Sequence, residues 1–102
     1  MLLYNVTIKI DKSIAAEWLQ WMLHEHIPAV MESGQFQGSR ISRLLDQPQE
    51  DEDETYVIQY QCESMAHFNH YMETYANQRR EEHNARYKGR FVAFRTLMEV
   101  VG

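Results

Sequence analysis

The chain of 102 residues has one cysteine, two prolines, four glycines and no excess of basic residues. The single cysteine, Cys62, excludes an intramolecular disulfide, and its place in an apolar stretch indicates a small core residue and not a nucleophile. Ten basic against fifteen acidic residues give a formal charge of -5. Such an acidic chain repels phosphate groups, which argues against binding to nucleic acid or to an anionic membrane surface.

Long apolar runs are missing as well. No stretch approaches the roughly 20 apolar residues that a membrane span requires. Residues 1–10 have no basic start and no small-residue cleavage site, so they do not resemble a signal peptide. We therefore predict a soluble cytoplasmic protein. Its length and its 44% of apolar residues predict one domain over residues 1–102.

Alternating apolar and polar side chains predict four strands, at residues 1–10, 36–46, 56–62 and 91–101. The segment 47–54, between the second and third of them, contains Pro48 and five acidic residues. We expect a solvated hairpin loop there, whose charge opposes pairing with another chain.

Two helices are predicted between these strands. The first follows a cap at Asp11 or Ser13 and ends at Gly34. Pro28 lacks the N–H that an uninterrupted helix needs, so this helix is expected to kink or restart there. The second, longer helix is expected to begin after a cap at Ser64 and to end at the next glycine.

The element order βαββαβ is that of a ferredoxin-like α+β sandwich. Right-handed crossovers put both helices on one face of a four-stranded antiparallel sheet with strand order 4-1-3-2. We expect the following side chains to face the helices: Tyr4, Val6, Ile8, Ile58, Tyr60, Phe94 and Met98. The opposite face is expected to carry Asn5, Thr7, Gln59, Phe91, Arg95 and Leu97. Because that face mixes apolar and polar groups, we predict a homodimer that covers it.

No strong catalytic motif is present: the chain has no P-loop, no GxGxxG, no GxSxG and no CxxC. The triplet His24-Glu25-His26 is not HExxH, and side chains two apart on a helix point in different directions. His67 and His70 can face one ion, but such pairs are common on surfaces. We predict no bound metal and no cofactor.

The antiparallel helices predict that His26 lies nearer to His67 and His70 than to His83, against a His26–His83 pair within one subunit. Arg79 and His83 continue the apolar stripe of the second helix. Either the helix extends beyond the sheet, and its last turns meet solvent or a partner, or these two side chains lie at the mouth of a pocket. In the second case they can hold a carboxylate or a carbonyl oxygen.

The candidate ligand-binding residues are Trp21, His26, Tyr60, Arg79, His83 and Arg95. Core packing is the alternative for Trp21, and an interface ion pair, with Glu99, is the alternative for Arg95. A buried Arg79 needs a partner. We expect Glu17 or the partner subunit to supply it, and not Glu82; failing these, an anionic ligand remains.

Four pieces of the sequence resemble a bacterial family of proteins of similar length and unknown function. They are Tyr4-Asn5-Val6-Thr7, His26-Ile27-Pro28-Ala29-Val30-Met31 with Gly34 and Phe36, Arg80-Glu81-Glu82-His83, and Phe91-Val92-Ala93-Phe94-Arg95-Thr96. The resemblance implies a ferredoxin-like fold related in shape to the dimeric α/β-barrel proteins, and no assigned activity. The wider barrel group includes cofactorless monooxygenases and enzymes acting on aromatic or ketide-like compounds, a link of fold alone.

Three functions remain open. The first is a dimeric small-molecule-binding or regulatory module that holds an apolar or anionic ligand between helices and sheet. The alternative is a small cofactorless enzyme of the barrel type, monooxygenase- or isomerase-like, acting on an aromatic or anionic metabolite with Trp21, His26 or His83. A purely structural, dimer-forming role is the third, and a closed, fully packed interior would favour it.

Overall fold

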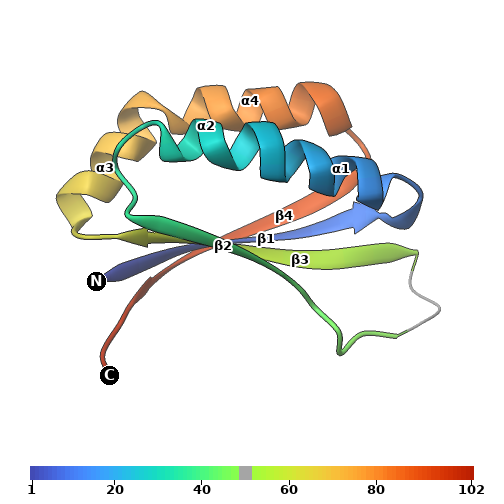
Figure 1. The fold of residues 1–102 in the computed structure, drawn as a ribbon, viewed down its shortest axis with the longest axis horizontal. Coiled ribbons are helices and arrows are strands. Elements are labelled where there is room, and N and C mark those ends of the chain that lie inside the picture. The colour runs from blue at the N-terminus through green and yellow to red at the C-terminus, as the bar shows by residue number, and fades with distance from the viewer. Residues whose placement is uncertain (49–51) are drawn as a thin grey trace.

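The computed structural model describes residues 1–48 and 52–102. Along the chain the elements are β1 (Leu2–Asp11), η1 (Lys12–Ile14), α1 (Ala15–Trp21), η2 (Met22–His26), α2 (Ile27–Met31), β2 (Gly38–Arg43), β3 (Asp53–Cys62), α3 (Met65–Thr74), α4 (Ala76–Tyr87) and β4 (Phe91–Glu99). All the helices cover one face of the sheet (Figure 1). The predicted βαββαβ order is confirmed.

The sheet is antiparallel, with the strand order β2-β3-β1-β4. This is the predicted order, read from the other edge. The strand ends differ from the prediction, because β2 covers only Gly38–Arg43 and β3 begins at Asp53. Two residues of the predicted loop 47–54 therefore belong to a strand, and positions 49–51 of that loop lie outside the described residues.

The register of β4 reverses its predicted orientation. Val6 pairs with Arg95 and Ile8 with Ala93, so the following side chains of β4 share the helix-covered face: Phe91, Ala93, Arg95 and Leu97. The open face instead carries Val92, Phe94, Thr96 and Met98. The prediction that Phe94 and Met98 point inward, and Phe91, Arg95 and Leu97 outward, is wrong. Both alternating sets of this strand contain large apolar residues, so its period alone does not identify the buried one.

The first helical segment restarts as Pro28 predicts. Between α1 and α2 the chain forms a π-turn, η2, in which the N–H of Ile27 donates to the carbonyl of Met22, five residues earlier. Pro28 then occupies the first turn of α2, where its missing N–H costs nothing. The segment ends at Gly34, whose φ of 76° is the left-handed conformation that favours glycine.

The second helical segment is divided, where one continuous helix was predicted. Ser64 caps α3 by accepting a hydrogen bond from the backbone N–H of His67 at 3.3 Å, as predicted. Tyr75 then departs from helical geometry with φ -119°, and α4 continues beyond it. Gly89, with φ 79°, turns the chain into β4.

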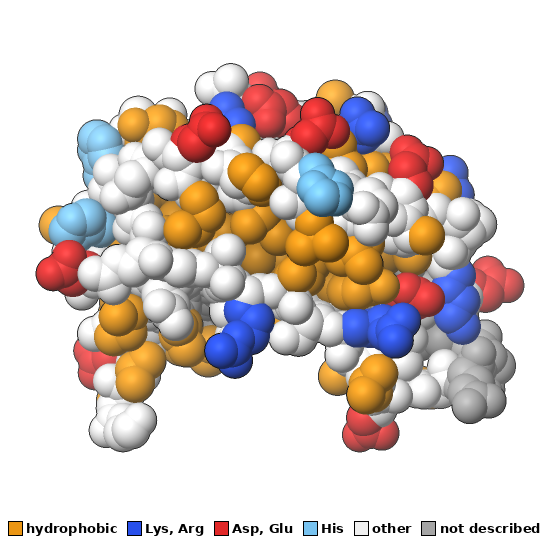
Figure 2. Space-filling model, viewed as in Figure 1, with side chains coloured by type: hydrophobic (Ala, Val, Ile, Leu, Met, Phe, Trp, Pro, Cys, Tyr) orange, Lys and Arg blue, Asp and Glu red, His pale blue; other side chains and the backbone are white. Residues whose placement is uncertain are grey.

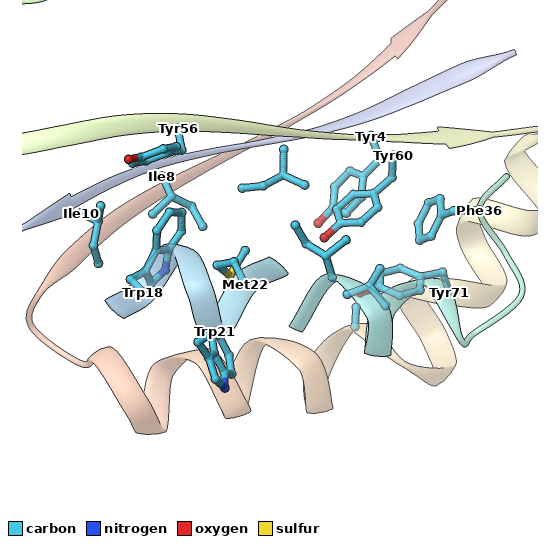
Figure 3. Close-up of a cluster of buried hydrophobic side chains, with 14 of the residues drawn as sticks. Tyr4, Ile8, Ile10, Trp18, Trp21, Met22, Phe36, Tyr56, Tyr60 and Tyr71 are labelled. Carbon is cyan, nitrogen blue, oxygen red and sulfur yellow. The ribbon is translucent and has the colours of Figure 1, made fainter. Parts of the chain in front are cut away.

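The core lies between the sheet and the helices. Its fully buried side chains include Trp18 and Met22 from the first helical segment and Ile10 and Ile58 from the sheet. Tyr4 and Tyr60 extend side by side from the sheet toward the helices, with their ring centroids 6.1 Å apart (Figure 3). Cys62 is fully buried, as predicted.

The sheet face without helices is open. Figure 2 shows the molecule as an arch that is hollowed beneath the sheet. Two large apolar side chains of this face are strongly exposed, Val92 at 53% and Phe94 at 58%. Among residues 1–48 and 52–102, no helix has the length and apolar character to cross a membrane.

Candidate functional site

A cavity of about 40 Å³ lies between the sheet and the helices. Its apolar walls come from β1, β3, β4, η2 and α2. Its polar lining consists of Tyr4, Tyr60, Tyr71, His26, His83, Arg80 and Arg95. A site of roughly 10–15 Å³ holds one water. The cavity therefore has room for a few waters or for the polar head of a small ligand, and Arg95, which is exposed, marks its opening to solvent.

His83 is neutral, and its tautomer is determined by Trp18. The indole Nε1–H of Trp18 donates to Nε2 of His83 at 2.9 Å. Because an indole only donates, Nε2 carries no proton and the ring hydrogen is on Nδ1. Burial, followed by the charges of His26 and Arg95, lowers the pKa of His83 to about 4.

His26 is also neutral, and one of its nitrogens lacks a partner. Its Nδ1 is buried and forms no hydrogen bond with the described residues. Burial, followed by the charges of Arg79 and Arg95, lowers the pKa of His26 to about 4. The neutral ring has one nitrogen without a proton, which can accept a hydrogen bond or a proton.

The two imidazoles lie close together, with ring centroids 5.8 Å apart, so the prediction against a His26–His83 pair is wrong. Side chains on a helix lean toward the N-terminus of that helix. In antiparallel helices these directions are opposed, and the two rings lean toward each other. The predicted neighbours are engaged elsewhere: His67 bonds Ser64 at 2.8 Å, and His70 packs on Tyr75.

Two arginines of the cavity lack a carboxylate partner. Arg80 Nη2 donates to the hydroxyl of Tyr4 at 3.1 Å and lies 3.8 Å from the sulfur of Met72. Arg95 forms no hydrogen bond or ion pair within the described parts of the chain. An interface ion pair with Glu99 stays a prediction. The positive charge of both guanidinium groups is thus uncompensated.

Arg79 differs from these two. It forms an ion pair of 3.3 Å with Glu82, one turn further along α4. The expectation that Glu82 cannot serve as its partner is wrong, because residues three apart on a helix are neighbours. Arg79 does not line the cavity, although its charge acts on His26 and Tyr71.

The tyrosines supply neutral hydroxyl groups. Burial raises the pKa of Tyr60 well above its ordinary value, with smaller contributions from Tyr71 and Tyr4. Burial likewise raises the pKa of Tyr71 to about 12. Both phenols keep their protons near pH 7 and can donate to an anion.

A second depression of about 510 Å³ lies on the outer surface between the two helical segments; we call it the interhelical groove. It is lined by Trp21, Glu25, His26, Glu82, Ala85 and Arg86. The guanidinium of Arg86 lies 5.3 Å from the ring centroid of Trp21, a cation–π contact. His26 is the residue that lines both this groove and the cavity.

Of the candidate residues, His26, Tyr60, His83 and Arg95 line the cavity. Trp21 lines the groove and packs on His26 with ring centroids 5.1 Å apart. The sequence analysis missed Tyr4, Tyr71 and Arg80. The helical stripe could have revealed Arg80, because it lies four residues after the buried Ala76 and three before His83.

A metal site is not apparent. In the part of the chain that the structure describes, no group of three or more His, Cys, Asp or Glu side chains could hold a metal ion. The absence of a bound metal stays a prediction for elemental analysis.

The four-stranded antiparallel sheet with helices on one face is a ferredoxin-like fold, and one structural neighbour is a dimeric ferredoxin-like protein. The chain belongs to the family described as Domain of unknown function (DUF4286), whose model matches residues 1–101. A comparison with curated proteins finds no match.

Several solved structures share the fold. HapK from Hahella chejuensis is 16% identical, with 100% of this chain and 94% of that one covered and a TM-score of 0.72. An antibiotic biosynthesis monooxygenase-like protein from Deinococcus radiodurans is 14% identical, with the same coverage and a TM-score of 0.72. A dimeric ferredoxin-like protein from an uncultured marine organism is 11% identical, with 100% and 96% covered and a TM-score of 0.71. At these identities the likeness concerns the fold alone.

Proposed function

We propose that the chain binds a small organic anion, a carboxylate or an enolate, with its charged head in the cavity. The observation that carries this proposal is that Arg80 and Arg95 line the cavity without a carboxylate partner among residues 1–48 and 52–102. The half-buried guanidinium of Arg80 has lost part of its hydration, and an anionic ligand would replace that hydration with charge-assisted hydrogen bonds. Arg95, exposed at the opening, adds positive charge.

The remaining groups of the cavity fit an anion as well. His26 and His83 are neutral, and Tyr60 and Tyr71 offer protonated hydroxyls. Among the residues that the structure describes, no carboxylate lines the cavity. A chain with a net charge of -5 thus gathers uncompensated positive charge at one enclosed place, where it attracts small anions.

Acetate is a suitable first probe, because its few heavy atoms match a cavity of about 40 Å³. We expect saturable acetate binding in calorimetry and in amide chemical shifts around β4 and α4. Arg80→Met and Arg95→Met should each weaken it about 10- to 100-fold, the loss of a hydrogen bond between charged groups. The matched control is Lys88→Met, an exposed cation after α4 that lines neither the cavity nor the open sheet face. Equal affinity in all three variants would refute an anion site in the cavity.

We further propose that two copies associate through the open sheet face. The exposed Val92, Phe94 and Met98 lie there, and so does Asn5, whose buried Oδ1 has no partner within residues 1–48 and 52–102. A structural neighbour is a dimeric ferredoxin-like protein. Such an apolar face is typical of an interface.

Light scattering at tens of micromolar should give the mass of a dimer. Phe94→Glu should yield monomers, whereas Leu45→Glu, which places the same charge at an exposed site outside the sheet, should not. A monomeric unmodified chain would contradict the dimer and leave the anion site untouched. The cytoplasmic location proposed from the sequence can be tested by cell fractionation.

A second candidate function is that of a small cofactorless enzyme. The observation that favours it is that His26 lines the cavity as a neutral imidazole, and its Nδ1 is buried without a partner among the described residues. Such an imidazole can act as a general base. One structural neighbour is monooxygenase-like. Turnover of a bound compound, and its loss in His26→Gln, would distinguish the enzyme from a binding module.

A further inference from the structure

His26 connects two spaces that are otherwise separate. It lines the cavity beneath the helices and also the interhelical groove on the outer surface. Of its two ring nitrogens, only Nδ1 is buried without a partner among the described residues. Nδ1 is therefore enclosed in the protein, whereas the His26 side chain as a whole is only partly buried.

The backbone presents His26 in an unusual way. It is the last residue of the π-turn η2, where the N–H of Ile27 bonds the carbonyl of Met22. A π-turn inserts an extra residue into a helix, and such turns occur often at functional sites. Trp21, at the start of this turn, packs on the imidazole and limits its rotation.

The charged and titratable groups around His26 differ on its two sides. On the cavity side they are Arg80, Arg95, His83, Tyr60 and Tyr71. On the groove side they are Glu25, Glu82 and Arg86, with Arg79 paired to Glu82. Cations in the cavity disfavour a proton there and favour an anion, whereas in the groove two carboxylates offset the two guanidinium groups. A proton is therefore less disfavoured on the groove side than in the cavity.

We propose that His26 carries a proton from a ligand hydroxyl in the cavity to water in the groove. The ligand is therefore a weak organic acid, an enol or a phenol, which the cavity holds as its anion. This inference rests on the proposed anion site and adds the class of ligand and the way its charge arises.

The step balances without any further reactant. The ligand O–H bond breaks, its electron pair stays on the oxygen beside Arg80 and Arg95, and the proton forms a bond to Nδ1 of His26. The resulting imidazolium gives its Nε2 proton to water in the groove. After the anion leaves, solvent protonates Nε2, and Nδ1 loses its proton to the water that refills the cavity.

Acetylacetone is the probe, because its enol is a weak acid and its enolate has a distinct absorbance. Its oxygens can enter the cavity while its methyl groups remain at the opening beside Arg95. Stopped-flow mixing between pH 6 and pH 8 measures how fast bound enolate forms. With His26 present, the neutral enol can bind and then ionise, so the rate should follow the enol concentration and vary little with pH.

Without this imidazole, only enolate that ionised in solution can bind. In His26→Gln and in His26→Phe, which keeps an aromatic ring against Trp21, the rate should follow the free enolate concentration and rise with pH. At pH 6 it should be slower by about 10²-fold, at the lower end of general acid–base effects. Added imidazole should restore it through the open groove. The matched control is His24→Gln, two residues earlier on the same turn, whose exposed ring bonds Gln20 at 3.0 Å.

Each outcome separates the two proposals. Suppose that enolate binds, that its affinity depends on Arg80 and Arg95, and that both His26 variants keep a rate that varies little with pH. The proton role of His26 is then refuted and the anion site stands. If neither acetate nor enolate binds, the anion site itself fails. A flat profile in His24→Gln together with a rising profile in both His26 variants supports the proposal.

Discussion

The hydrogen bond from Trp18 to His83 gives a quantitative prediction for the variant Trp18→Phe. The indole is fully buried, and its Nε1–H is the group that donates to His83 Nε2 at 2.9 Å. Phenylalanine keeps a ring in the core but removes the donor. The acceptor is then buried without a partner, which costs about 1–3 kcal/mol.

The smaller ring adds a second cost. A void lowers stability by about 24 cal/mol per Å³, so the lost part of the indole contributes about 1 kcal/mol. We expect Trp18→Phe to reduce the free energy of unfolding by about 2–4 kcal/mol. A chain of this length has roughly 5–15 kcal/mol in total, so the variant should remain folded at 25 °C.

Urea unfolding of four proteins checks the reasoning: the unmodified chain, Trp18→Phe, His83→Leu and the double variant. Replacing both partners by apolar groups removes the unsatisfied acceptor, so the double variant should be more stable than the sum of the single effects predicts. Nitrogen NMR should show His83 protonated at Nδ1, and its pKa should rise in Trp18→Phe, because Nε2 becomes free to take a proton. Additive stabilities together with an Nε2-protonated His83 would refute the hydrogen bond.

Three further predictions concern the histidine pKa values, the Arg79–Glu82 ion pair and the metal content. Burial lowers the pKa of His26 and of His83 from 6.5 to about 4 in the folded chain, so the unfolded chain binds more protons between these values. The stability that the two neutral imidazoles contribute should therefore be complete above pH 6.5 and be lost as the pH falls toward 4. For His83 alone the loss in the free energy of unfolding is roughly 3 kcal/mol at most. Urea midpoints that stay constant over this pH range would contradict the prediction. Arg79→Met removes a half-exposed ion pair with Glu82 and should change stability by about 1 kcal/mol or less, while NMR titration should show a raised pKa of His26; severe unfolding would reveal a structural role that the ion pair does not explain. Elemental analysis of protein purified without a metal-affinity tag should give far less than one metal per chain, since no spacing of the five histidines predicts a site.

Much of the fold follows from the sequence for identifiable reasons. Alternation along β1 and β3 coincides with burial, because their inward residues are apolar and many of their outward residues are polar. Ser64 and Gly34 mark helix ends through local chemistry, a side-chain acceptor and a positive φ. These signals depend on residues close together in the sequence, so they can be recognised without knowing which strands pair.

Which face of β4 is buried, in contrast, depends on how the strand pairs with β1. Phe91 and Ala93 alternate with Val92 and Phe94, so both faces of the strand are apolar. Only the pairing of Ile8 with Ala93 decides which set is buried. Helices cover one face of β4, and we propose that a second copy covers the other. Polar side chains therefore do not distinguish an exposed face of this strand from a buried one.

The helical pattern of the sequence could not predict the His26–His83 pair, for a different reason. A pattern locates a residue along the helix axis but does not show how far its side chain extends along that axis. Each of the two side chains leans toward the start of its own helix, which brings their rings to a centroid distance of 5.8 Å. The π-turn before Pro28 also changes the direction of the side chains that follow Met22. Pro28 predicts a disturbance, but it does not specify a π-turn.

Anion binding and proton uptake should be linked at this cavity. Burial keeps both imidazoles neutral in the free protein, helped by the charges of Arg79 and Arg95 at His26 and of His26 and Arg95 at His83. An anion would offset the two arginine charges that line the cavity, so the pKa of His26 and His83 should rise toward their ordinary value when it binds. Nitrate isolates this effect, because it stays fully ionised and exchanges no proton of its own. At pH 5.5, calorimetry in two buffers of different ionisation enthalpy should show net proton uptake, which His26→Phe should reduce. Binding without uptake would mean that the anion lies too far from the imidazoles to change their pKa values, and would move the site away from the cavity toward the exposed end of Arg95.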